Sequence, residues 1–205
     1  DTITEKTSGS GTTVSNLKNP NQPFRNLLIN GDMKIAQRAT SATTAVNGSY
    51  QTLDRWRFYD NCDGTYTTAQ TALSLADQAS TGGQTHALDI QVTGADTSIA
   101  ADQFAMVMQF VEAQNCQHLK FGTSSAVDLT LQFYVKSNLT GTTCGWISKE
   151  DSTFCQAPFE FTINSANTWE KKTVTIPSNA VIQASGSAIA NDNGVGIGVA
   201  FALAL

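Results

Sequence analysis

Alternating apolar and polar residues recur along most of this chain and predict β-strands. In residues 127–136 every second side chain is apolar, which places those side chains together on one face of a sheet. Residues 85–93, 157–164 and 169–177 show the same period. The last of these strands should stop at Pro177, because proline cannot donate to a sheet ladder. The inward set is Leu88, Ile90, Val92, Val127, Leu129, Leu131, Phe133, Val135, Phe159, Phe161, Ile163, Val174 and Ile176.

Three segments depart from this alternation. Residues 103–110 are apolar on both faces, which predicts a central strand covered on both sides. Residues 194–205 alternate large with small side chains, and a glycine-rich strand face indicates close approach of another backbone, ring or ligand. Residues 111–123 predict a short helix that Gly122 ends.

These elements predict an all-β protein. About eight strands with one short helix favour a two-sheet antiparallel β-sandwich, specifically a jelly roll. Residues 1–22 are polar and contain Gly and Ser, so they are interpreted as a stalk end or linker, and residues 23–205 as the sandwich. Because the chain stops within an apolar strand, we expect the natural chain to continue beyond residue 205.

The segment NLLINGDMKIAQRATS, residues 26–41, combines an apolar run with a turn signal. Leu27–Ile29 predicts the first strand of the sandwich. Asn30–Asp32 predicts a turn or bulge that uses the tolerance of glycine for positive φ. In DRWR, residues 54–57, Trp56 is predicted in the core, with the arginines directed toward carboxylates or solvent.

Charge and hydropathy exclude two classes of partner. Only 14% of the residues are charged, and the net charge is −5. Without a basic stripe the chain is not expected to bind nucleic acid. It contains neither an apolar stretch of membrane-spanning length nor a positive-then-apolar leader, so membrane insertion is not expected.

The sequence contains no recognisable catalytic motif, and we predict that the protein is not an enzyme. His86 falls on an apolar strand face, as a packed core or rim histidine would, and His118 is expected to be solvated in the short helix. No nucleophile elbow or zinc-protease motif occurs. Glu150 and Asp151 are adjacent and diverge, so they are interpreted as a solvated hairpin turn rather than a glycosidase pair.

The four cysteines include no C-x-x-C pair, which argues against a zinc site. Cys144 and Cys155 lie symmetrically about a predicted hairpin tip at Lys149–Glu150, so a disulfide is geometrically conceivable. The favoured alternative is two small thiols in a protein assembled in a reducing cytoplasm.

Aromatic side chains provide the candidate ligand contacts, because an apolar sugar face stacks on a ring. The alternative places the tryptophans in the core and the tyrosines on an ordinary solvent face. Tyr134 is the strongest candidate, since its strand parity directs it outward. The candidate glycan contacts are Tyr59, Tyr66, Tyr134 and Trp146. No cofactor is predicted, although Asp32 and Asp54 are weighed as calcium ligands in a loop.

Several motifs between residues 26 and 177 occur together in a characteristic order: NLLINGDM, QRATS, DRW, EAQN followed by GTSSA, LTLQFYVKS and WEKKTVTIP. This set resembles a family of bacteriophage tail-fibre and related virion structural proteins, common in marine and cyanobacterial phages. The segment DTITEKTSGSGTTV also resembles the repeat of phage fibre stalks.

The resemblance implies a virion protein, assembled in the cytoplasm of a host bacterium, with a carbohydrate-binding-module-like sandwich in a homotrimer. It implies no catalytic residue. The expected function is that of a fibre or appendage domain that attaches to host surface polysaccharide by weak, multivalent binding. Two alternatives stay open: a capsid decoration or tail connector domain that binds other virion proteins, and a carbohydrate-binding module of a polysaccharide-degrading tailspike.

Overall fold

The computed structural model describes residues 26–43, 48–178, 182 and 187–204. The predicted stalk, residues 1–22, lies outside the described residues. The strands are β1 (Ser41–Thr43), β2 (Arg57–Asp60), β3 (Thr65–Ala72), β4 (His86–Gly94), β5 (Ala105–Glu112), β6 (Leu129–Val135), β7 (Gly141–Lys149), β8 (Cys155–Ile163), β9 (Glu170–Ile176) and β10 (Val195–Ala204). The helices are α1 (Leu75–Ser80) and two 3-10 helices, η1 (Ala113–Asn115) and η2 (Gln117–Leu119).

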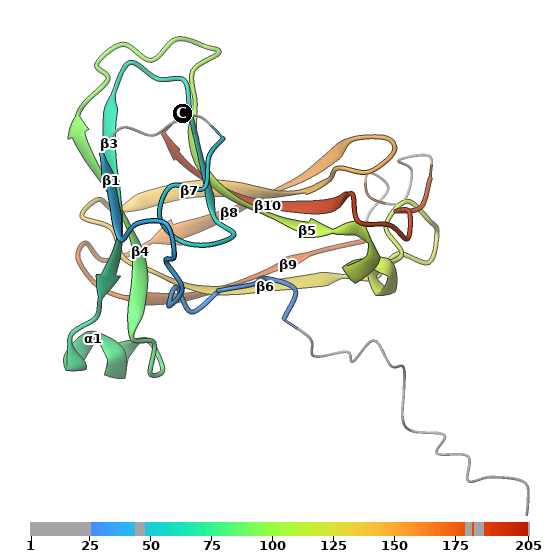
Figure 1. Ribbon diagram of the computed structural model, residues 1–205, viewed down its shortest axis with the longest axis horizontal. Helices are drawn as coiled ribbons and strands as arrows, with labels where there is room; N and C mark the ends of the chain where they lie inside the picture. Colours follow the sequence, from blue (N-terminus) through green and yellow to red (C-terminus); the bar gives the residue numbers. More distant parts are fainter. Residues whose placement is uncertain (1–25, 44–47, 179–181, 183–186, 205) are drawn as a thin grey trace, which may run out of the picture.

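The described strands form three antiparallel sheets. A five-stranded sheet has the order β2-β5-β10-β7-β8, a three-stranded sheet the order β1-β3-β4, and β6 pairs with β9 alone. Figure 1 shows β6 and β9 running alongside one face of the five-stranded sheet, with β1, β3 and β4 standing across one end. The all-β prediction is confirmed, whereas the division into two sheets is not, because the described strands separate into three sheets.

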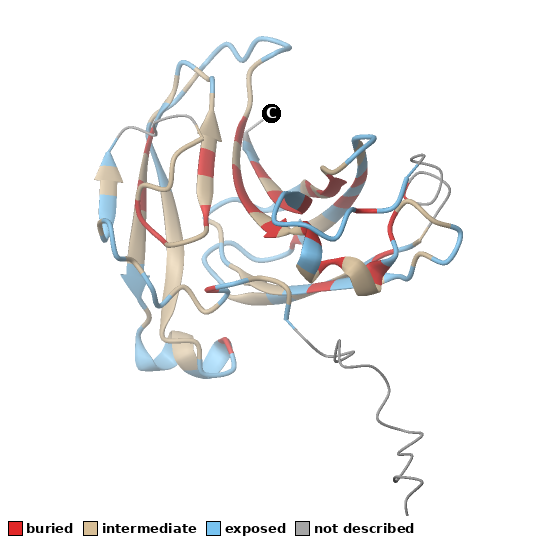
Figure 2. Ribbon diagram, turned by 45° about the vertical axis from the view of Figure 1, so that its right-hand side comes forward, coloured by how far each residue is buried: buried red, intermediate tan, exposed pale blue. Residues whose placement is uncertain are grey.

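The main core lies between the five-stranded sheet and the β6–β9 pair. Val111, Ile147 and Val199 from the larger sheet are buried in one cluster with Leu131 and Ile176 from the smaller one. Figure 2 shows that buried residues gather along the strands of the five-stranded sheet. The predicted inward positions are confirmed for the residues that belong to this cluster or pack against it: Leu129, Leu131, Phe133, Phe159, Phe161, Val174 and Ile176. Ile163 is also buried.

A second cluster joins the three-stranded sheet to the five-stranded sheet. Leu53, Trp56 and Val107 are buried there, and Leu88 and Ile90 of β4 pack against them. The core position predicted for Trp56 is therefore confirmed.

Two inward predictions are wrong. The side chain of Val92 is 61% exposed and that of Val127 is 42% exposed. Val92 lies farther along β4 than the residues that pack on the second cluster. Val127 lies in the loop before β6, where its backbone N–H donates to the carbonyl of Leu119.

The helix predicted in residues 111–123 is wrong as a continuous element, because only η1 and η2 form there. Lys120 follows η2 with a φ of 52°, so the chain turns before a helix can propagate. Gly122 has a φ of 85°, and a Cβ there would lie 1.9 Å from the carbonyl oxygen of Ser187, so glycine is required for both reasons.

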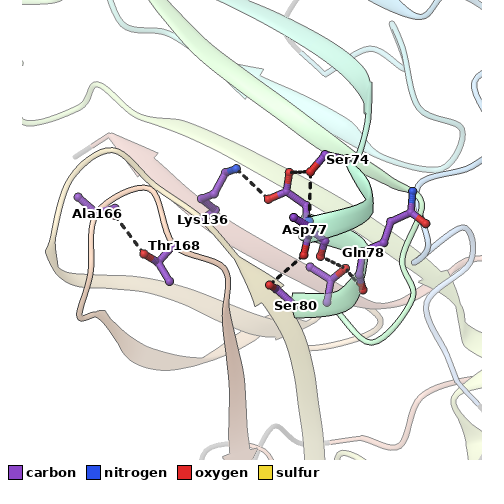
Figure 3. A network of polar contacts seen from close by, with 9 residues as sticks. Ser74, Asp77, Gln78, Ser80, Lys136, Ala166 and Thr168 are labelled. Carbon is purple, nitrogen blue, oxygen red and sulfur yellow. Dashed lines mark hydrogen bonds and ion pairs between the residues drawn. The ribbon is translucent and has the colours of Figure 1, made fainter.

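Helix α1 was not anticipated from the pattern because it is short and has no buried residue. Its N-cap is Ser74, whose Oγ accepts a hydrogen bond from the N–H of Asp77 at 3.1 Å. Lys136 Nζ donates to Asp77 Oδ1 at 3.3 Å, as Figure 3 shows. The hydroxyl of Ser74 and then Lys136 hold the pKa of Asp77 below its ordinary value. This network ties α1 to the end of β6.

Residues 26–36 form no strand, so the prediction for Leu27–Ile29 is wrong. The side chain of Gln109, fully buried on β5, takes the place of a partner strand. Its Oε1 accepts from the N–H of Ile29 at 2.7 Å, and its Nε2 donates to the carbonyl of Ile29 at 2.9 Å. One amide thus satisfies both backbone groups of Ile29.

The turn predicted at Asn30–Asp32 is confirmed, but glycine is not the residue that permits it. Positive φ values occur at Asn30 (55°) and Met33 (57°), and Gly31 has none. The Asn30 side chain donates to the carbonyls of Ile35 and Asp54 and accepts from the N–H of Ile35. The NLLINGDM motif is therefore an irregular segment whose backbone is held by the side-chain amides of Asn30 and Gln109.

Candidate functional site

The outer face of the five-stranded sheet, meaning the side directed away from β6 and β9, is the candidate site. Strand register defines it, because side chains alternate between the two faces. One row crosses all five strands and contains Arg57, Met108, Ala200, Trp146 and Pro158. From Arg57 to Trp146 this row spans three strand spacings, or about 14 Å.

Two further rows complete the outer face. Tyr59, Met106 and Ala202 form one row, and Phe110, Gly198, Ser148 and Gln156 form the other. Glu160 lies on the same face of β8, opposite Cys144. The outer face thus carries aromatic and methionine side chains between one arginine margin and one acidic margin.

Small residues of β10 form the middle of the outer face. Ala200 is fully buried by the larger side chains beside it. A Cβ on Gly198 would lie 2.6 Å from Ser148 Oγ and 3.2 Å from a ring carbon of Phe110. On Gly196 it would lie 2.6 Å from the Cα of Ala113. The predicted close approach to the glycines is therefore confirmed for both a ring and a backbone.

Trp146 lies half-buried in the central row of the outer face. Its indole Nε1 is buried and has no hydrogen-bond partner among the described residues. A tryptophan N–H usually finds a partner when it is buried, so the unpaired Nε1 is an unusual feature of Trp146.

Arg57 lies at the β2 margin among three aromatic rings. Its guanidinium carbon is 4.4 Å from the ring centroid of Tyr50 and 5.4 Å from that of Phe110. Its Nη1 donates to the hydroxyl of Tyr59 at 3.1 Å. That hydrogen bond, and the nearby tyrosine oxygens, raise the pKa of Arg57 despite partial burial. The arginine therefore stays charged and is oriented by the rings.

The arginines near this margin differ in their partners. Arg55 Nη2 lies 2.8 Å from Glu112 Oε1, and this hydrogen bond lowers the pKa of Glu112. Arg38 Nη1 lies 3.6 Å from Asp54 Oδ1. The prediction that these arginines are directed toward carboxylates or solvent is confirmed for Arg55, which pairs with Glu112, whereas Arg57 packs among rings.

The four predicted glycan contacts are divided between three environments. Tyr59 and Trp146 lie on the outer face. Tyr66 of β3 is only 4% exposed and packs on Phe58, with ring centroids 5.5 Å apart, and burial raises its pKa to about 12. This burial leaves Tyr66 no accessible ring face for stacking.

Tyr134 lies away from the outer face, on β6. Its hydroxyl is 3.0 Å from the position that a Cβ on Gly82 would take, so it packs against the turn that follows α1. Strand parity correctly directs Tyr134 away from the core, but a segment distant in sequence covers it in part.

Sequence reasoning missed Arg57, Phe110, Met106 and Met108 as neighbours of Tyr59 and Trp146. Each strand alternates clearly, but nothing in the sequence reveals that β10, the last strand in the chain, inserts between β5 and β7. The glycine and alanine face of β10 was the one available signal, because it indicated crowding by larger neighbours.

The two aspartates weighed for calcium are engaged with neighbouring groups. Asp32 pairs with Lys34 at 3.2 Å, and Asp54 accepts from the N–H of Gln37 at 3.2 Å. Within the part of the chain that the structure describes, no three His, Cys, Asp or Glu side chains are grouped to hold a metal ion.

The β7–β8 hairpin differs from the predicted one. Its connection is residues 150–154, so Cys155 pairs with Lys149 and Cys144 pairs with Glu160. The conceivable disulfide between Cys144 and Cys155 does not form, because the longer connection shifts the register, and all four cysteines are free.

The acidic residues at this hairpin are not simply solvated. Ser148 Oγ donates to Glu150, and Asp151 Oδ2 accepts from the N–H of Ala190 at 2.5 Å. Lys149 is fully buried and donates to the carbonyls of Asp151 and Thr153, which explains how its ammonium is accommodated. The interpretation of a solvated turn is therefore wrong.

Neither histidine lies on the outer face. His86 is half-buried at the start of β4, with Nδ1 3.0 Å from Thr85 Oγ1. His118 is half-buried in η2.

A separate hollow of about 390 Å³ lies near η2, lined by Cys116, Gln117, Lys120, Phe121, Thr123, Ser125, Ala188 and Ile189. Gln117 Nε2 there donates to the carbonyls of Ala113, Ile189 and Ala190. The Gln117 amide therefore stabilises the backbone around the hollow. The outer face is the stronger candidate for a binding site, because it carries aromatic rings.

Among the helices of the described residues, none has the length and apolarity to cross a bilayer. No protein-family model matches this chain, and no curated protein matches it.

Proposed function

We propose that the outer face binds glycans and that the protein is a bacteriophage fibre or appendage domain used in host attachment. The observation that carries this proposal is that Trp146 and Tyr59 lie on the same sheet face, together with Phe110 and Arg57. Rings flanked by hydrogen-bonding groups suit sugars, because ring faces stack on C–H surfaces while polar groups bind the hydroxyls.

The arrangement of the sheets supports a carbohydrate-binding-module-like sandwich as the finer fold. In this proposal the five-stranded sheet is one layer and β6–β9 belongs to the other, with the main core between them. Figure 1 shows no further sheet of described residues over the outer face, which is the face proposed to bind a chain of sugars.

We further propose that the chain acts as a homotrimer on the virion and carries no catalytic activity. Linking three shallow sites raises the effective concentration of the second and third binding events, so weak single contacts are sufficient for attachment. The support is the resemblance of residues 1–177 to fibre proteins. Light scattering on the chain with residues 1–22 present should give three times the monomer mass, and a monomer mass would contradict this assembly.

The function is tested by binding purified protein to an array of bacterial surface polysaccharides. The wild-type protein should bind, and Trp146→Ala should lose about fivefold or more in affinity, since removal of a stacked ring typically costs roughly 1–3 kcal/mol. Trp169→Ala is the matched control, because this half-buried tryptophan lies beside Lys136 and off the outer face. Equal losses in both variants, or no binding by the wild type, would contradict the proposal.

A further inference from the structure

Arg57 differs from the neighbouring arginines in having no acidic partner. Arg38 and Arg55 each lie within ion-pair distance of a carboxylate, at 3.6 Å and 2.8 Å. The ion pairs of the described residues include none for Arg57, whose closest groups are the Tyr50 and Phe110 rings and the Tyr59 hydroxyl.

The aromatic surroundings make this unpaired charge effective toward an anion. Rings displace water from the guanidinium, so its interaction with a carboxylate is less screened than that of an exposed lysine. The rings and the Tyr59 hydroxyl also hold the side chain in place, which reduces the entropy lost when a ligand binds. A planar guanidinium matches the two oxygens of a carboxylate in a paired geometry.

The other charges of the outer face are consistent with a ligand that is acidic at one end. Glu112 is occupied by Arg55, and Glu150 accepts from Ser148. Glu160 lies at the opposite margin, on β8, and would repel an anion there. An acidic group is therefore favoured at the β2 margin and disfavoured at the β8 margin.

We infer that the outer face recognises an acidic glycan, with the carboxylate of a hexuronic acid on Arg57 and neighbouring sugars extending toward Trp146. This inference rests on the proposed glycan-binding function and specifies the class of ligand. The row from Arg57 to Trp146 gives the direction of the bound chain, with Met108 and Ala200 between them, both buried under neighbouring groups.

The test compares soluble polymers on the full chain by calorimetry. The probes are polygalacturonate, the same polymer after chemical reduction of its carboxyl groups, neutral dextran and dextran sulfate. Carboxyl reduction should weaken binding by about tenfold or more, the loss expected for a charge-assisted hydrogen bond. This arm uses unmodified protein, so it does not depend on whether a variant folds.

Variants then locate the contact. Arg57→Gln should lose the same factor toward polygalacturonate, and Arg57→Lys should recover part of it, because lysine keeps the charge without the planar fork. Arg38→Gln is the matched control, because Arg38, like Arg57, lies over the Tyr50 ring. Binding should stay within about twofold in this variant, because Asp54 already neutralises the charge of Arg38.

Equal binding of polygalacturonate and its reduced form would overturn the inference, as would unchanged affinity in Arg57→Gln. Dextran sulfate that binds as tightly as polygalacturonate, with the same dependence on Arg57, would also overturn the assignment to a carboxylate. Binding of all polymers through Trp146 alone would refute the inference and leave the proposed function intact. Failure of every polymer here and every polysaccharide on the array would refute both.

Discussion

The two faces of the five-stranded sheet are built from the same strands yet have opposite characters. Adjacent rows show this directly. The inner row contains Phe58, Val107, Phe201, Gly145 and Phe159, and the outer row contains Arg57, Met108, Ala200, Trp146 and Pro158. On the inner face a glycine on β7 makes room for large rings, whereas on the outer face small residues of β10 leave tryptophan and arginine as the prominent groups.

The inner face is covered by the β6–β9 pair, whereas no other sheet of described residues lies over the outer face, on which the proposed binding site is placed. Inner side chains pack with Leu131 and Ile176 of the opposing pair. The outer face carries rings that are only half-buried: Tyr59, Phe110 and Trp146. Stability should therefore depend on the inner face and binding on the outer face, and substitutions at adjacent positions can separate the two.

The largest effect is expected from Ile147→Ala, set against its neighbour Trp146→Ala. Ile147 is fully buried in the main core, so its truncation should cost about 2–5 kcal/mol in the free energy of unfolding. Urea denaturation should show a clearly smaller cost for Trp146→Ala, which should instead weaken the proposed glycan binding. Equal costs in stability would mean that the outer face is as structural as the core.

A second comparison uses one glycine from each face. A Cβ on Gly145 would lie 2.3 Å from the carbonyl oxygen of Ala200, which is backbone and cannot rotate away. Gly145→Ala should therefore cost roughly 1–3 kcal/mol or more. Gly198→Ala meets mainly side chains, Ser148 Oγ and a ring carbon of Phe110, and should cost less. Thermal unfolding measures both, and the reverse order would contradict the assignment of the rigid contact to the inner face.

A third comparison concerns polar residues. Gln109→Leu removes the amide that binds both backbone groups of Ile29, and leaving them unpaired should cost about 1–3 kcal/mol. Faster hydrogen exchange at the Ile29 amide should accompany this loss. The matched change on the outer face, Gln156→Leu, alters an exposed side chain and should stay within about 0.5 kcal/mol. Unchanged exchange at Ile29 would contradict the role given to Gln109.

The smallest effect is a dependence on alkaline pH. Burial raises the pKa of Tyr66 from 10.0 to about 12, so the folded protein keeps this proton at pH values where the unfolded chain loses it. The contribution of Tyr66 to stability is complete below pH 10 and is lost as the pH rises toward 12. Ultraviolet titration should show one late tyrosine ionisation, absent in Tyr66→Phe. Persistence of the late step in that variant would assign it to another tyrosine.

Much of the fold could be predicted from the order of residues. Local alternation of apolar and polar residues indicates where a strand occurs and on which face of the sheet each side chain lies. The strand near residues 103–110 was predicted from its apolar run rather than from alternation, and it is an inner strand of its sheet, second from the edge. The prediction that it is covered on both sides is not met by a second sheet, because no other sheet of described residues lies over its outer face. The core position of Trp56 was also predicted correctly. The helix in residues 111–123 was not, because the turn at Lys120 and the contact of Gly122 with Ser187 involve segments far apart in the chain. Helix α1 was missed because its sequence carries no apolar period.

The candidate site could be predicted only in part. Tyr59 and Trp146 were identified as aromatic candidates, and the structure places both on the outer face. Tyr66 and Tyr134 are also aromatic and were candidate glycan contacts as well. Tyr66, however, is buried against Phe58, and Tyr134 packs on the turn at Gly82. Parity gives the side of a strand on which a ring lies, and it gives no information about what covers that side.

The sequence by itself determined the all-β class, the facing of most strand residues and the turn at Asn30, because each depends on neighbours along the chain. Tertiary structure alone decided that β10 inserts between β5 and β7, that Gln109 holds Ile29, and that Arg57 lies among rings without an acid. These pairings join residues tens of positions apart. Their free energy comes from burial and hydrogen bonds that exist only once the sheets have packed.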